Sequence, residues 1–117
     1  MKDYYKKFVS CCLRECTDFN ELTDIIKRVR HNRAVAANHK LQLELFKLED
    51  KGGPVVLQLL EHKDDRVRLS AAVYCLYAQI HVPLAKEILS EIEKYTQHPM
   101  LVFNATIALN DCKPWKT

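Results

Sequence analysis

Cysteine and histidine are the side chains of this sequence best suited to chemistry. The cysteines are five in number, at Cys11, Cys12, Cys16, Cys75 and Cys112. They include no Cys-x-x-Cys pair, and no closely spaced pair of histidines accompanies them, so the usual ligand spacing of a structural zinc site is missing. An odd number of cysteines without a disulfide pattern indicates free thiols in a reducing compartment. We therefore predict no metal site, and we expect Cys12, Cys16 and Cys75 to pack as small apolar side chains.

The histidines could serve a cysteine nucleophile as general base, which is the alternative to a packing role. Most of them fall at predicted helix ends and turns. The five histidines are His31, His39, His62, His81 and His98. A Cys-His hydrolase also needs a group that orients the base, and the sequence does not place one. There is no serine nucleophile elbow and no glycine-rich phosphate loop, because "GGP" is the only glycine cluster. We predict a protein that is not an enzyme, with no catalytic residues and no cofactor.

One short segment is strongly basic and raises the possibility of nucleic-acid binding. The stretch "KRVRHNR" carries the cations Lys27, Arg28, Arg30 and Arg33, which could contact phosphates. It contains no aromatic platform and matches no known binding motif, so a solvated helix end is the favoured interpretation. The formal net charge of +3 does not by itself indicate a nucleic-acid partner.

Acidic and aromatic side chains are the candidates for binding a protein. Carboxylates can complement a basic cleft and speed association, and large aromatics often anchor interfaces. We select as partner-binding candidates Glu44, Asp50, Tyr77, Glu87, Glu91 and Trp115. In contrast, Asp64 and Asp65 are expected to cap a helix, and Arg68 is expected to tie one helical pair to the next.

Helices must position all of these residues. With 117 residues, 48% of them hydrophobic, and only two glycines, the chain is predicted to form a single all-α domain over residues 1–117. The start has no apolar leader segment, and no stretch is long and apolar enough for a membrane span, so we expect a cytoplasmic protein with no membrane partner.

Apolar spacing predicts seven helices. The capped turn "KDD", the "KGGP" segment and the prolines set most of the boundaries. The expected ranges are 5–16, 22–29, 34–48, 54–62, 65–80, 83–95 and 98–110.

A weak internal repeat suggests how these helices are arranged. The stretch "EHKDDRVRLSAAVYCL" compares with "TQHPMLVFNATIALN" some 34 to 36 residues later, with Ala71 and Ala105 in equivalent places. The second copy is degenerate, since Val102 stands where Arg68 would be. Such spacing is typical of stacked helical hairpins, which bury their apolar faces only against neighbouring hairpins.

The stretch "LLEHKDDRVRLSAA" resembles a HEAT-type repeat, with an Asp-x-x-Val-Arg-like turn before an alanine-containing second helix. From about Ala34 to Leu109 the chain resembles a small bacterial family of HEAT-like helical domains of unknown function. Some members of that family are immunity proteins encoded beside toxins, including those of contact-dependent growth inhibition. The resemblance implies a short HEAT-like α-solenoid and a cytosolic toxin inhibitor that binds one toxin domain, most often a nuclease. It transfers no contact residues.

Together these observations lead us to expect an immunity protein. It would bind one cognate toxin domain in a one-to-one complex and block the active site of that toxin. The expected toxin is a nuclease, in particular an RNase. Two alternatives remain open at this point. One is a nucleic-acid-binding or regulatory module that uses Lys27, Arg28, Arg30 and Arg33. The other is a protein-protein scaffold unrelated to toxins.

Overall fold

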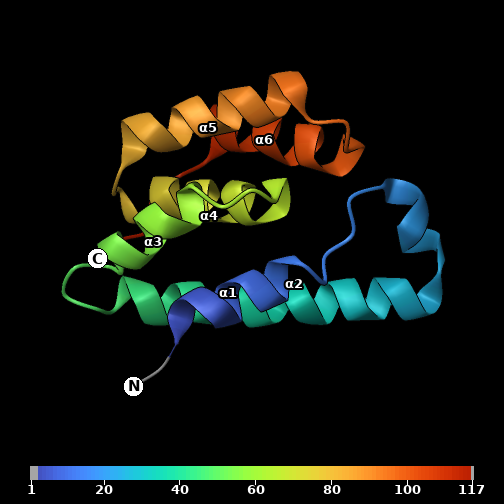
Figure 1. Ribbon diagram of the computed structural model, residues 1–117, viewed down its shortest axis with the longest axis horizontal. Helices are drawn as coiled ribbons and strands as arrows, with labels where there is room; N and C mark the ends of the chain where they lie inside the picture. Colours follow the sequence, from blue (N-terminus) through green and yellow to red (C-terminus); the bar gives the residue numbers. More distant parts are fainter. Residues whose placement is uncertain (1–2, 117) are drawn as a thin grey trace.

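The computed structural model describes residues 3–116, and this part of the chain forms helices without any β-strand. The all-α prediction is therefore confirmed for the described residues. None of their helices is both long and apolar enough to cross a membrane. In chain order the elements are α1 (Tyr4–Cys12), the 3-10 helix η1 (Phe19–Thr23), α2 (Ile25–Phe46), α3 (Gly53–Leu60), α4 (Asp65–Ala78), α5 (Val82–Tyr95) and α6 (Pro99–Asp111), as Figure 1 shows.

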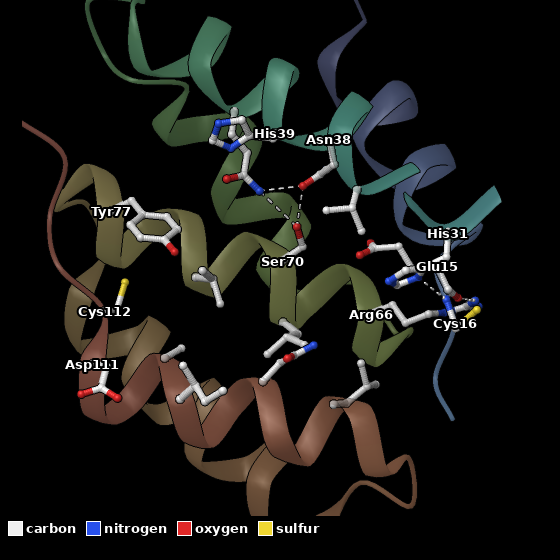
Figure 2. A pocket seen from close by; sticks show the side chains of 18 of the residues that line it. Glu15, Cys16, His31, Asn38, His39, Arg66, Ser70, Tyr77, Asp111 and Cys112 are labelled. Carbon is white, nitrogen blue, oxygen red and sulfur yellow. Dashed lines mark hydrogen bonds between the residues drawn. The ribbon is translucent and has the colours of Figure 1, made fainter. Parts of the chain in front are cut away.

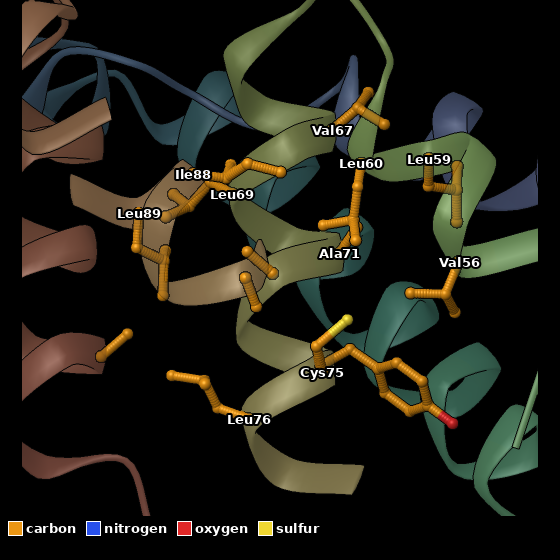
Figure 3. Close-up of a cluster of buried hydrophobic side chains, with 14 of the residues drawn as sticks. Val56, Leu59, Leu60, Val67, Leu69, Ala71, Cys75, Leu76, Ile88 and Leu89 are labelled. Carbon is orange, nitrogen blue, oxygen red and sulfur yellow. The ribbon is translucent and has the colours of Figure 1, made fainter. Parts of the chain in front are cut away.

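Helix α4 lies at the centre of the core and contacts α1, α3, α5 and α6. Figure 3 shows side chains of α3 and α5, among them Leu59 and Leu89, gathered on either side of it. Ala71 and Ala72 are fully buried, because small side chains let neighbouring helices approach closely. Tyr74 fills the core beside them, and its hydroxyl donates a hydrogen bond to the Lys51 carbonyl oxygen at 2.8 Å.

The charged residues around the start of α4 are structural, as predicted. Asp64 caps the helix, and its carboxylate accepts a hydrogen bond from the Arg66 backbone N–H at 2.9 Å. Arg68 forms ion pairs with Asp65 at 2.9 Å and with Glu91 of α5 at 3.4 Å. Arg68 thus joins the hairpin of α3 and α4 to the hairpin of α5 and α6.

The largest departure from the expected elements is in α2. We expected two helices, over 22–29 and 34–48, but one helix runs from Ile25 to Phe46. The segment between them contains neither glycine nor proline, so nothing in it interrupts the helix. Asp24 caps this helix by accepting a hydrogen bond from the Lys27 N–H at 3.1 Å. Asp18 and Glu21 form a capping box that starts η1.

The first helix is shorter than its apolar spacing suggested. It ends at Cys12, and Leu13 beyond it is exposed. The chain then turns through η1 before α2 begins, so α1 covers only part of the length of α2 (Figure 1).

The "KGGP" segment acts at the start of α3. Helix α2 has already ended at Phe46, and Gly52 takes the left-handed conformation, with φ 72°, as the N-cap of α3. Pro54 lies in the first turn of α3, as predicted. The sequence signal was read correctly as a break, but the glycine belongs to the following helix.

Candidate functional site

A groove of about 580 Å³ lies between α2, α4 and α6, with α4 as its floor (Figure 2). Residues at helical spacing of three or four line it from each helix, for example His31, Val35 and Asn38 of α2. The volume is within the range of pockets that hold a small molecule or the side chains of a protein partner. We define these three faces as the α2–α4–α6 groove.

Two connections close the groove at its ends. At one end the segment after α1 reaches the start of α6, where the Met100 N–H donates to the Thr17 carbonyl oxygen at 3.2 Å. Beside it, the rings of Phe19 and Phe103 meet edge to face with centroids 5.8 Å apart. At the other end the chain after α6 crosses back toward α2. The result is a basin with four sides.

Trp115 fixes the crossing at the second end. Its ring stacks on Tyr77 with centroids 4.8 Å apart and planes 2° from parallel, and its backbone N–H donates to the Tyr77 carbonyl oxygen at 2.8 Å. The Trp115 ring also meets Phe46 of α2 edge to face at 5.3 Å. The two aromatic residues chosen from the sequence are thus neighbours on the groove wall, and both line it.

A polar network lines the groove where α2 meets α4. Asn38 and Gln42 are the buried polar residues of the described chain, at 4% and 7% exposure. The Asn38 side-chain oxygen accepts hydrogen bonds from Gln42 Nε2 at 2.6 Å and from the Ser70 hydroxyl at 2.8 Å. No buried side-chain N or O atom of residues 3–116 lacks a hydrogen-bond partner. A satisfied network of this kind fixes one relative position of the two helices.

Glu15 lies at the end of the groove next to Arg66 (Figure 2). Burial raises the pKa of its carboxyl to about 7, against the opposing effects of a hydrogen bond with Cys12 and of the Arg66 charge. The Arg66 guanidinium already donates to both carboxylate oxygens of Asp64 and to the carbonyl oxygens of Leu13 and Glu15. Arg66 therefore joins α4 to the segment that follows α1.

Cys16 and His31 come together at the same end, yet their geometry is not that of a nucleophile and base. The contact is a hydrogen bond from the Cys16 backbone N–H to His31 Nδ1, at 2.8 Å. His31 Nδ1 is thus an acceptor, and burial lowers the pKa of the ring. The pKa of the Cys16 thiol is raised, mainly by burial, which disfavours the thiolate that nucleophilic attack requires.

The other cysteines also behave as packing residues in this structure. Cys12 and Cys75 are fully buried, and burial raises the pKa of both thiols, that of Cys75 to about 12. All five cysteines are free. Within residues 3–116 no group of three or more His, Cys, Asp or Glu side chains is arranged to hold a metal ion.

The four acidic candidates are not brought together. Glu44 lies between α1 and α2, on the side of α2 away from the groove. Asp50 accepts a hydrogen bond from the Gly52 N–H at 2.9 Å in the turn before α3. Glu87 is exposed on α5, and Glu91 of the same helix pairs with Arg68.

The basic candidates form one exposed cluster. Lys27, Arg28, Arg30 and Arg33 are all exposed on the first turns of α2, the part that extends past the end of α1. They do not line the α2–α4–α6 groove.

Sequence reasoning missed most of the groove. Asn38, Gln42, Ser70, Asn104 and Ile107 all line it, and none was selected. One signal was available, because Asn38 and Gln42 share a helical face with Ala34, Leu41 and Leu45. Polar side chains within an apolar face indicate either a buried network or a site, and here they form a network that is part of the groove lining.

Comparisons of the chain with protein-family models, curated proteins and solved structures found no match. The resemblance to HEAT-like immunity proteins therefore stays a prediction, and the functional argument depends on the groove and the surfaces around it.

Proposed function

We propose that this protein is a non-catalytic inhibitor that binds one cognate bacterial toxin domain in the α2–α4–α6 groove and so keeps the toxin's active site from its substrate. The observation that carries the proposal is the groove itself, a preformed basin of about 580 Å³ that three helices line and two connections close. A nuclease, and in particular an RNase, is the toxin class that we propose.

A short HEAT-like solenoid is the architecture that we propose for the stack. In support, α3 with α4 and α5 with α6 form two successive helical pairs. The equivalent residues Ala71 and Ala105 are both fully buried, and the second helix of each pair lines the groove. In this scheme α2, α4 and α6 are the inner helices of the stack, which present its binding surface.

The chemistry of the groove suits a protruding segment of a protein. Ile107 is 43% exposed and Val35 42% exposed, and these apolar side chains face a lining that also contains Asn104, His39 and Ser70. A mixed lining with apolar anchors and a few hydrogen-bonding groups is typical of protein recognition. The fixed Trp115 and the satisfied polar network in the lining mean that little ordering is required on binding.

The test is co-expression with the C-terminal domain of an exported protein encoded beside this chain. We expect a one-to-one complex and loss of the toxin domain's nuclease activity when this protein is added. Ile107→Asp places a charge in the groove at an exposed position, so it is expected to weaken the complex at least about tenfold without unfolding the protein. Tyr95→Asp is the matched control, because Tyr95 is 75% exposed on α5, outside the groove.

Two outcomes would count against this proposal. If a complex forms and the toxin stays active, the scaffold function is favoured. If Ile107→Asp and Tyr95→Asp weaken the complex equally, the groove is not the binding site.

A nucleic-acid-binding function is the second candidate, because Lys27, Arg28, Arg30 and Arg33 are exposed together. Its signature would be RNA or DNA binding whose affinity falls steeply with salt and falls further when Arg30 and Arg33 are replaced by alanine.

A further inference from the structure

The first turns of α2 present an apolar face that no other helix of the described chain covers. Helix α2 has 22 residues and α1 has 9, and α1 ends at Cys12. Past that point Ile25 is 67% exposed and Ile26 80% exposed, which is unusual for isoleucine. Together with Val29 they line a hollow of about 470 Å³ with Arg14, Arg30 and Arg33 around it. We call this surface the α2 overhang.

Basic side chains predominate around the α2 overhang. Arg14 lines both its hollow and a second one between α1 and α2. Among the residues that line the two hollows, one is a carboxylate, Glu44, and six are basic: Lys6, Lys7, Arg14, Arg30, Arg33 and Lys40. Within residues 3–116 neither Arg30 nor Arg33 forms an ion pair. No ion pair within these residues therefore offsets the charges of Arg30 and Arg33.

We propose that the α2 overhang binds an acidic amphipathic helix of another protein, laid against α2 in line with α1. The apolar side of that helix would cover Ile25, Ile26 and Val29, which lie at helical spacing along one side of α2. Its carboxylates would face Arg14, Arg30 and Arg33. The bound helix would thus pack on the first turns of α2, and α1 packs on the later turns of the same face.

The same observations disfavour two other occupants. A nucleic acid would pair its phosphates with the arginines but leave the three aliphatic side chains without a partner, and no aromatic residue lines the overhang for base stacking. A second copy of this chain, placed with two-fold symmetry, would bring the same arginine-lined surface of both copies together, and like charges repel.

The test uses synthetic peptides and the intact protein. The probe is a helix-forming peptide with leucine along one face and glutamate on the others, labelled for fluorescence anisotropy. One control peptide has the same composition in scrambled order, and another has lysine in place of glutamate. We expect saturable binding of the first peptide at micromolar to millimolar concentration, and much weaker binding of both controls.

Variants separate this surface from the rest of the molecule. Ile26→Asp is expected to weaken binding of the acidic peptide at least about tenfold, because it removes apolar contact and adds repulsion. Arg30→Ala with Arg33→Ala is expected to weaken it and to reduce its salt dependence. The matched controls are Tyr95→Asp and Lys94→Ala on α5, which are expected to leave binding unchanged.

Three results would overturn the proposal. The first is equal affinity for the ordered and scrambled acidic peptides, which would indicate charge attraction alone. The second is tighter binding of a single-stranded RNA of matched charge, with no effect of Ile26→Asp. The third is dimerisation of the protein that disappears on Ile26→Asp. None of these results depends on the toxin complex, so this proposal and the proposed function can fail separately.

Discussion

The carboxyl of Glu15 shows how the fold changes the chemistry of a single residue. Burial at the end of the groove raises its pKa to about 7, because a carboxylate loses hydration there that Arg66 only partly replaces. The ionised form is therefore disfavoured in the folded protein relative to the unfolded chain. A group with a raised folded pKa stabilises the protein below its unfolded pKa, and that stabilisation is lost as the pH rises through the folded pKa.

Glu15→Gln is predicted to remove this pH dependence. Between about pH 5 and about pH 8 the wild-type protein should lose about 1–2 kcal/mol of unfolding free energy relative to the variant, since glutamine cannot ionise. Urea unfolding of both proteins at the two pH values measures the difference. A constant difference across that range would mean that Glu15 ionises normally.

Glu21 supplies a control of opposite sign. The backbone N–H groups of Thr17 and Asp18 donate to its carboxylate, at 3.0 and 3.3 Å, and lower its pKa. Its contribution to stability is therefore present above its unfolded pKa and lost as the pH falls through its lowered folded pKa. Glu21→Gln should destabilise the protein at neutral pH and have little effect in strong acid.

At the scale of elements, the turn from α2 to α3 depends on one glycine. Gly52 has φ 72°, and a Cβ atom built there would lie 2.6 Å from Leu45 Cδ2 in the core. Gly52→Ala is predicted to lower the free energy of unfolding by about 1–3 kcal/mol, from backbone strain and from displacement of Leu45. The measurement is urea unfolding with a fixed denaturant slope.

The neighbouring glycine provides the matched control. At Gly53 an added Cβ would have His81 Nε2 as its nearest neighbour, at 3.7 Å, which is ordinary contact, and the residue begins α3. Gly53→Ala should be neutral or slightly stabilising, because alanine favours a helix. Equal destabilisation by both substitutions would show that neither strain nor the contact with Leu45 matters.

The helix boundaries that the sequence predicted correctly are those with local causes. Asp64 caps α4, and Pro83 lies in the first turn of α5, which begins at Val82, because capping and proline geometry act within a few residues. The exposed start of α2 has a non-local cause. Ile25, Ile26 and Val29 lie at apolar helical spacing, but they stay exposed because α1 ends before it reaches them.

The groove was predictable only in part for the same reason. Tyr77 and Trp115 were selected as large aromatics, and the structure stacks them. The groove itself depends on which faces of α2, α4 and α6 lie opposite one another. Patterns within a few residues of sequence do not predict how distant helices pack. The acidic candidates were chosen by charge alone, and two of them have partners within the protein, Asp50 in its own turn and Glu91 with Arg68 of another helix.

At the scale of the whole molecule, α2 carries two separate surfaces on opposite sides. His31, Val35, Asn38 and Gln42 face the groove, whereas Ile26, Arg30, Arg33 and Lys40 line the hollows on the other side. Within each set the residues follow one another mostly at intervals of three or four positions, so each set lies on one side of the helix. Two ligands could therefore bind to opposite sides of α2 at the same time without touching each other.

We predict that the two surfaces bind independently. Because distant sites without shared partners act additively, Ile107→Asp should weaken only the complex in the groove and Ile26→Asp only the binding of the acidic peptide. Trp115, the single tryptophan, lines the groove, so its fluorescence should change when the toxin domain binds and stay constant when the acidic peptide binds. A titration of each ligand in the presence and absence of the other, followed at Trp115, measures the coupling. A change in either affinity of more than about threefold would show that the two sides of α2 communicate, and would contradict a rigid helix between them.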